Sequence, residues 1–335
     1  MFLAYFGDFC LSVAYCDVAR YNAPMTNANT HKIGIIQLTS GDSVDENIAQ
    51  CEAYITQLAG QGAEMVFLPE NAFYMRREAR KRSSSEAVAQ NQRSSSEAVA
   101  HDKDAADIDV AGEKNPKCTT VEHPGVLAAQ GWAKQHNIWI VIGSIAPRES
   151  EDQAQPYNRS VVINAEGEIA AHYDKIHLFD VELEDGESYM ESARMAAGSE
   201  AKLTPTPFGM FAPTICYDLR FPNLYRQLAQ AGAKLFSVPA AFTVPTGKAH
   251  WEVLLRARAI ETGAFVIAAA QTGEHPGGRL SYGHSLVVNP WGEVLCDLGE
   301  EPGCAVVELD MSEVDKMRST IPAWNYERKW RVGSA

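Results

Sequence analysis

Short apolar runs alternate with segments of helical periodicity along most of this chain, and this alternation constrains the fold more than any other feature. His31 to Leu38 has the composition of a buried strand, Asp45 to Gly62 places apolar residues on one helical face, and Glu64 to Leu68 is a second strand. A strand–helix–strand order is typical of α/β domains. We therefore predict an α/β fold.

The same pattern resumes after residue 118. Helices are expected over Gly125–His136, Asn223–Ala231 and His250–Thr262. The expected strands are Ile138–Ile145, Asn158–Asn164, Glu168–His172, Met210–Cys216, Leu235–Pro239, Ala264–Ala270, Ser285–Val288, Val294–Asp297 and Ala305–Leu309. No linker interrupts the second half, so we predict one domain over residues 31–320.

Three segments differ from this pattern. Residues 1–30 are an extension without a clear strand or helix pattern, and Met25 is an alternative start. Residues 76–118 form a polar insertion with a tandem duplication, RSSSEAVAQNQ followed by RSSSEAVAHDK. Two copies with little apolar content cannot build a core, so a mobile insertion is expected rather than a helical repeat. Residues 321–335 are an aromatic and charged tail, expected to pack on a surface or a partner.

The charge and the cysteines exclude several classes of partner. The formal net charge is -14, and a surface this acidic repels nucleic acid and anionic membranes, so neither is expected as a partner. The 7 Cys include no C-x-x-C pair and have no zinc-ligand spacing, which predicts no metal site. No basic residue precedes the apolar stretch Met1–Cys16, and scattered thiols fit a reducing compartment. We expect a cytoplasmic protein.

Cys216 is the first candidate for a catalytic side chain. It ends an apolar run, Phe211 to Ile215, and a helix is expected a few residues later. A thiol on such a turn lies in the field of a helix N-terminus, which favours the thiolate. The alternative is a small buried residue at a strand end. The polar turn Tyr217–Pro222 is a poor place to bury a thiol, and it favours the nucleophile.

Glu70 and Lys175 also follow expected strands. A carboxylate at the end of a buried strand points into the crevice where α/β sheets bind ligands, and Glu70 is a candidate general base there. A fixed ammonium such as Lys175 can stabilise the oxyanion of a tetrahedral intermediate. The alternatives are a solvated loop glutamate and a surface lysine. Each residue alone is weak evidence, whereas the three together predict acyl-transfer chemistry.

The combination resembles the nitrilase superfamily of carbon–nitrogen hydrolases. The matching segments are FLPENAF at 67–73, YDKIHLFD at 173–180 and TICYDLRFP at 214–222. The likeness runs from about Lys32 to Ile321, and it departs at the N-terminal extension and at the duplicated insert. It implies a four-layer α-β-β-α sandwich, with two mainly mixed β-sheets and helices outside. It also implies a homodimer or a higher homo-oligomer, formed through the helical layer near the nucleophile.

The resemblance implies the remaining parts of the site. A second pocket glutamate corresponds to Glu191, and the backbone N–H of Tyr217 is expected to bind the oxyanion beside Lys175. Glu70 takes the proton of Cys216, the thiolate attacks an amide carbon, ammonia leaves, and water hydrolyses the thioester. This chemistry implies no metal and no organic cofactor.

The C-terminal half resembles the branch that contains deaminated-glutathione amidase and omega-amidase. The matching segments are AHWEVLLRARAIETGAFVIAAAQTG at 249–273 and SYGHSLVVNPWGEVL at 281–295. The expected activity is hydrolysis of the terminal amide of a small, carboxylate-bearing molecule. The alternatives are an omega-amidase acting on 2-oxoglutaramate, a nitrilase acting on a small nitrile, and a catalytically silent binding or scaffold protein.

A carboxylate-bearing substrate requires basic residues near the pocket. Arg220, His250 and Arg279 are candidates that the sequence does not rank, and Arg220 has the alternative of a structural ion pair with a carboxylate. Phe242 is expected either as a pocket wall or as plain packing. His284 is expected as a satisfied core histidine, with a place in the pocket lining as the alternative.

Overall fold

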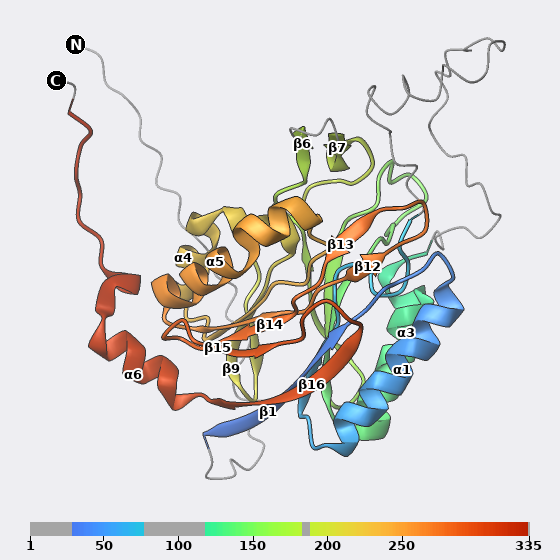
Figure 1. Cartoon of the computed structure of the whole chain (residues 1–335), viewed down its shortest axis with the longest axis horizontal. Coiled ribbons are helices and arrows are strands. Elements are labelled where there is room, and N and C mark those ends of the chain that lie inside the picture. The colour runs from blue at the N-terminus through green and yellow to red at the C-terminus, as the bar shows by residue number, and fades with distance from the viewer. Residues whose placement is uncertain (1–28, 77–117, 183–187, 334–335) are drawn as a thin grey trace.

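The structure is a computed structural model that describes residues 29–76, 118–182 and 188–333. The predicted insertion and most of the N-terminal extension lie outside the described residues. Within these ranges the main framework is a pair of six-stranded β-sheets (Figure 1). Two short hairpins accompany them, β6 (Asp180–Glu182) with β7 (Ser188–Met190), and β12 (Thr272–Glu274) with β13 (Leu280–Tyr282).

The first sheet has the strand order β16-β1-β2-β3-β4-β5. Its strands are β1 (Thr30–Gln37), β2 (Met65–Phe67), β3 (Trp139–Ile145), β4 (Arg159–Ile163), β5 (Ile169–Asp174) and β16 (Gly303–Asp310). The strands β1, β2 and β3 are parallel, while β16, β4 and β5 join antiparallel. The sheet is therefore mixed, and its parallel centre is buried on both faces.

The second sheet repeats this plan with the strand order β15-β14-β11-β10-β9-β8. Its strands are β8 (Thr204–Thr206), β9 (Gly209–Pro213), β10 (Leu235–Ser237), β11 (Phe265–Ala268), β14 (Leu286–Val288) and β15 (Val294–Asp297). Again three central strands, β9, β10 and β11, are parallel, and the outer strands are antiparallel.

The helices cover the outer face of each sheet. The α-helices are α1 (Val44–Gly60), α3 (Pro124–His136), α4 (Pro222–Gln230), α5 (Val244–Thr262) and α6 (Ser312–Thr320). Figure 1 shows α1 and α3 together on one side and α4 and α5 on the other. Short 3₁₀ helices are η2 (Thr120–Glu122), η3 (Glu191–Ala193), η4 (Cys216–Arg220) and η5 (Pro322–Asn325).

Three apolar clusters separate these layers. One packs α1 and α3 on the first sheet, one packs α4 and α5 on the second, and the third lies between the sheets. In the central cluster the rings of Phe67 and Phe211, from opposite sheets, meet edge to face with centroids 6.0 Å apart. This is the predicted four-layer α-β-β-α sandwich with mixed sheets, and the prediction is confirmed.

The largest differences from the expected elements lie at chain reversals. The strand expected to reach Cys216 ends at Pro213, and Cys216 instead begins η4. The helix expected from His250 begins at Val244, because Pro245 fits a first helical turn, where its missing N–H is not needed. Short elements such as β8, β12 and α6 were not predicted, since they lack a sustained apolar period.

The start of the C-terminal tail lies against the helical layer. The Arg226 guanidinium donates hydrogen bonds to the carbonyls of Ala323 and Tyr326, and Arg318 stacks 4.4 Å from the centre of the Trp324 ring. Over the described ranges, no helix combines the length and the apolar character needed to cross a bilayer.

Candidate active site

The three predicted catalytic side chains follow strands of both sheets. Glu70 comes three residues after β2, Lys175 directly after β5, and Cys216 three residues after β9. All three are buried, with 4%, 1% and 8% of their surface exposed. The first sheet thus supplies the acid and the amine, and the second sheet supplies the thiol.

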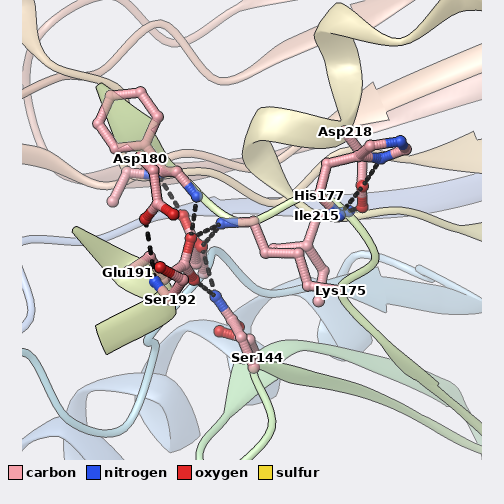
Figure 2. A network of polar contacts seen from close by, with 12 residues as sticks. Ser144, Lys175, His177, Asp180, Glu191, Ser192, Ile215 and Asp218 are labelled. Atoms are coloured by element: carbon pink, nitrogen blue, oxygen red, sulfur yellow. Dashed lines mark hydrogen bonds and ion pairs between the residues drawn. The ribbon is translucent and has the colours of Figure 1, made fainter. Parts of the chain in front are cut away.

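Lys175 lies between two carboxylates. Its Nζ donates to Glu70 Oε1 at 3.3 Å and to Glu191 Oε2 at 2.8 Å. Figure 2 shows the Lys175 side chain extending toward Glu191. Burial acts to lower the pKa of Lys175, but the charges of Glu70 and Glu191 outweigh it and raise this pKa. Lys175 is therefore a cation at neutral pH, and the structure brings Glu191 into the same site.

Glu191 is held from three sides at the start of η3. Besides Lys175, its carboxylate accepts the Phe179 backbone N–H at 2.7 Å and the Asn158 side-chain amide at 2.9 Å. Burial acts to raise the pKa of Glu191, but the charge and hydrogen bond of Lys175, with the other donors, lower it. Glu191 is therefore ionised at neutral pH. By contrast, the nearby Glu182 is exposed.

Glu70 is fixed through both its carboxylate and its backbone. The Ala241 N–H donates to Oε2 at 2.9 Å, and the Asn158 amide donates to Oε1 at 2.9 Å. The Gln271 side chain donates to the Glu70 carbonyl at 2.9 Å. The next residue, Asn71, has φ 57° and donates its backbone N–H to the Ser144 hydroxyl. These contacts join Glu70 to both sheets.

Cys216 occupies a strained turn. Its φ is 48°, in the left-handed region that non-glycine residues rarely adopt, and its N–H donates to the Pro239 carbonyl at 2.8 Å. Burial raises the pKa of the thiol, and the charge of Glu70 raises it further, against the opposing charge of Lys175. Burial and the Glu70 charge therefore oppose the thiolate that the field of a helix N-terminus was expected to favour. Desolvation and a neighbouring carboxylate dominate in the buried turn.

A buried aspartate links the segment of Lys175 to the turn of Cys216. Asp218 is fully buried and accepts hydrogen bonds from the Tyr173 hydroxyl at 2.7 Å and the Ile215 N–H at 3.0 Å. Its other oxygen accepts the His177 N–H at 3.1 Å and lies 2.7 Å from His177 Nδ1. Figure 2 shows His177 and Ile215 beside Asp218. Asp218 therefore holds the segments on either side of Lys175 and Cys216 together.

The predicted substrate-binding residues lie around Phe242. The Phe242 ring is buried 4.7 Å from the Trp251 ring, and the Arg220 guanidinium lies 5.5 Å from its centre. Arg220 also lies 5.9 Å from the Tyr217 ring and contacts Nδ1 of the exposed His250 at 3.3 Å. Among the described residues no carboxylate lies within ion-pair distance of Arg220, so within these ranges the alternative of a structural ion pair finds no support.

Arg279 and His284 come from the region of the β12–β13 hairpin. Arg279 donates to the Ala241 carbonyl at 2.9 Å and lies 5.8 Å from the Tyr189 ring centre, so it neighbours the peptide that holds Glu70. His284 pairs with Asp297 at 3.0 Å. It is a satisfied histidine, as expected, but it is half-buried rather than in the core.

Asn158, Asp218 and Ala241 were not recognised from the sequence. Asn158 stood at the beginning of an expected strand and Asp218 in a polar turn, and neither position predicts burial. Ala241 acts through its backbone N–H, which no side-chain pattern can indicate. In the part of the chain that the structure describes, no group of three or more His, Cys, Asp or Glu could hold a metal ion.

The family model for carbon–nitrogen hydrolases matches residues 32–319. The chain therefore belongs to the carbon–nitrogen hydrolase family, within the nitrilase superfamily, as its motifs predict. Deaminated glutathione amidase of Synechocystis is 37% identical over 292 residues, which cover 86% of this chain and 94% of that protein. The rat protein of the same name is 36% identical over 306 residues, covering 90% of this chain and 84% of that protein.

A fusion protein and solved structures agree with this assignment. The nitrilase and fragile histidine triad fusion protein NitFhit of Caenorhabditis elegans is 37% identical over 300 residues. The match covers 89% of this chain but only 61% of NitFhit. Its crystal structure superposes with a TM-score of 0.72 at 34% identity, covering 90% of this chain and 66% of that one. The structure of Nit3 of Saccharomyces cerevisiae superposes with a TM-score of 0.68 at 24% identity, covering 88% of this chain and 94% of the Nit3 chain. This likeness shows that the two proteins share the fold.

Proposed function

We propose that this chain is an amidase that hydrolyses the terminal amide of a small carboxylate-bearing substrate, of the deaminated glutathione type, to an acid and ammonia. The observation that supports this most is the buried array of Glu70, Lys175 and Cys216 at strand ends of two packed sheets. The relatives named deaminated glutathione amidase, which match most of the chain, support the substrate class.

The reaction begins with transfer of the thiol proton. The raised pKa of Cys216 means that the thiol is protonated in the resting site, so an adjacent base must accept its proton. Glu70 is that base. The thiolate attacks the amide carbon, and the carbonyl electrons become an oxyanion held by the Lys175 ammonium and the Tyr217 backbone N–H.

The tetrahedral intermediate then collapses to a thioester. Glu70 returns the proton to the departing nitrogen, the C–N bond breaks, and ammonia leaves. A water molecule attacks the thioester carbon and gives its proton to Glu70. The C–S bond then breaks to release the acid, and Glu70 returns the proton to the departing Cys216 sulfur. Glu191 positions this water and holds Lys175 by their 2.8 Å ion pair.

The substrate carboxylate requires a cation outside this array. Arg220 is suited to the role because its guanidinium lies beside Phe242 and Tyr217 and faces no carboxylate among the described residues. A planar guanidinium binds a carboxylate in a bidentate manner. Phe242 and His250 complete the proposed wall. The cytoplasmic location and the homodimer also belong to this proposal.

An ammonia-release screen tests the function. Deaminated glutathione, 2-oxoglutaramate, simple amides and small nitriles are compared, with Cys216→Ala as the inactive control. We expect release from the carboxylate-bearing amides and none from the nitriles, and we expect Cys216→Ala to lose at least about 1,000-fold in kcat because it lacks the nucleophile.

The other outcomes of the screen separate the alternatives. Preference for 2-oxoglutaramate makes the chain an omega-amidase, and turnover of nitriles makes it a nitrilase. Release at the same rate by Cys216→Ala contradicts the thioester mechanism. No release from any substrate, with Cys216 no faster than the other thiols toward iodoacetamide, supports a binding or scaffold protein.

A further inference from the structure

Asn158 lies at the centre of the polar array and has no role in the proposed reaction. Its Nδ2 is 2.9 Å from Glu70 Oε1 and 2.9 Å from Glu191 Oε1, and its backbone carbonyl accepts the Lys175 N–H at 2.9 Å. Only 4% of the residue is exposed. One residue therefore contacts both carboxylates through its side chain and the lysine through its backbone.

These contacts close a ring of four side chains. Lys175 bridges Glu70 and Glu191 on one side, and Asn158 bridges the same two carboxylates on the other. Two buried carboxylates that share one ammonium repel each other, and in such sites one of the pair ordinarily takes up a proton. An amide that donates one hydrogen to each carboxylate bridges the two without adding charge, and its hydrogen bond lowers the pKa of Glu191.

The orientation of the amide agrees with this role. Asn158 Oδ1 is buried and accepts no hydrogen bond from the described residues. A buried carbonyl oxygen without a donor costs stability. The opposite orientation would place Oδ1 against two carboxylate oxygens, which repel it. The two hydrogen bonds to Glu70 and Glu191 therefore set the orientation of the Asn158 amide, and they leave its carbonyl oxygen without a donor among the described residues.

We propose that Asn158 is a positioning residue that holds Glu70 and an ionised Glu191 at a set separation around Lys175, so that Glu70 can accept the Cys216 proton. This inference rests on the proposed amidase function. The titratable groups that act on the ring are Lys175, the two glutamates and Cys216. Without the amide donor, an ionised carboxylate loses a hydrogen bond and takes up a proton at higher pH.

The test is the pH profile of kcat/KM for ammonia release from the best amide, measured in full-length Asn158→Ala and Asn158→Asp. Because Asn158→Ala removes the donor, we expect kcat/KM at neutral pH to fall about 100-fold. We also expect its acid limb to move up by about one pH unit. Asn158→Asp has the same shape but adds a third carboxylate, so its loss and its shift are expected to be larger.

Asn164→Ala is the matched control. Asn158 directly precedes β4, and Asn164 directly follows it, in the turn to β5. Asn164 is also buried, and its side-chain amide also donates to a glutamate, Glu168, at 3.1 Å. We expect its pH profile to superimpose on that of the parent protein. Circular dichroism and urea unfolding establish whether each variant is folded. If Asn158→Ala does not fold, the isosteric Asn158→Asp provides the test in its place.

Each outcome decides between the two proposals. A fall in kcat/KM by the same factor at every pH, or an unchanged profile in a folded variant, overturns the positioning role while leaving the amidase function intact. Absence of ammonia release by the parent protein from every amide overturns the proposed function itself. A shift of the acid limb in Asn158→Ala and not in Asn164→Ala supports the positioning role.

Discussion

Burial alone does not distinguish Cys216, the proposed nucleophile, from a buried thiol such as Cys51. Burial raises the pKa of Cys51 to about 12, and no acid or base among the described residues acts on it. Burial raises the pKa of Cys216 as well, but Glu70 and Lys175 lie beside it. A protonated thiol next to a carboxylate can be activated when substrate arrives, whereas a protonated thiol in an apolar core cannot.

At the same scale, the ion pair between Glu191 and Lys175 predicts a pH-dependent stability. The pKa of Glu191 is lowered on folding, so its ion pair contributes fully above the ordinary glutamate value of 4.5 and is lost as the pH falls through the lower folded value. At pH 7 we expect Glu191→Gln to lower the free energy of unfolding by about 2 kcal/mol, the order of a charged hydrogen bond.

Urea unfolding of the two proteins between pH 4 and pH 8 measures this difference. It is expected to be constant above about pH 5 and to shrink below 4.5, the ordinary value, as the parent glutamate takes up a proton. A difference that grows as the pH falls would contradict the assignment of an ionised Glu191.

At the scale of elements, strand β3 supports the peptide that carries Glu70. A Cβ added at Gly143 would lie 2.2 Å from the Pro69 carbonyl oxygen and 2.3 Å from that of Leu68. The next residue, Ser144, accepts the Asn71 N–H. Glycine at 143 is therefore needed for a close approach of two backbones, and the position of Glu70 depends on it.

We expect Gly143→Ala to impair both stability and activity. The added methyl group meets backbone atoms that cannot move aside as a side chain can, so we expect a loss of about 1–3 kcal/mol in the free energy of unfolding. Because the displaced peptide precedes Glu70, kcat/KM should fall at least about tenfold. Urea unfolding and ammonia release measure the two effects.

Gly131→Ala provides the control for this variant. Gly131 is exposed in the middle of α3, and a Cβ there meets nothing within 4 Å. Alanine is a better helix former than glycine, so we expect a gain of up to about 1 kcal/mol with unchanged activity. If Gly143→Ala behaves like Gly131→Ala, the close approach of β3 does not position Glu70.

At the scale of the whole molecule, the packing of two sheets creates the site. The first sheet carries Glu70 and Lys175, and the second carries Cys216 and Ala241 at its own strand ends. The central apolar layer packs the two sheets together and so holds these strand ends close to one another. The hydrogen bond from the Ala241 N–H to Glu70 Oε2 joins the two sheets. The proposed chemistry therefore depends on the sandwich and not on either sheet alone.

The proposed homodimer belongs to this scale too. The outer face of α5 exposes Val253 and Ile260, which are 68% and 45% accessible. Light scattering should give about twice the mass of one chain, and Val253→Glu should shift the protein toward the monomer because it places a charge in an apolar contact. Leu127→Glu, on the exposed side of α3 in the opposite outer layer, should leave the mass unchanged. If the parent protein is a monomer and fully active, the proposal of a homodimer is wrong.

Much of the architecture could be predicted from local sequence. The central strands and α1 were predicted with boundaries close to the observed ones. A buried strand or an amphipathic helix requires an apolar pattern in its own residues, and that pattern can be recognised in the sequence. The reversals at Pro213 and Val244 were misplaced by several residues, since turns depend on packing as well as composition. For the candidate site, the motifs identified Glu70, Lys175 and Cys216 but not their supporting contacts.

By itself, the sequence determined the α/β class, the family and the side chains at the strand ends, because these depend on residue types and on spacings within short segments. Only the tertiary structure decided which groups hold those side chains. Asn158 and Ala241 contact Glu70 from 88 and 171 residues away along the chain. Such contacts exist only after the two sheets have packed, because packing brings the groups within hydrogen-bond distance and removes the water that would otherwise solvate them.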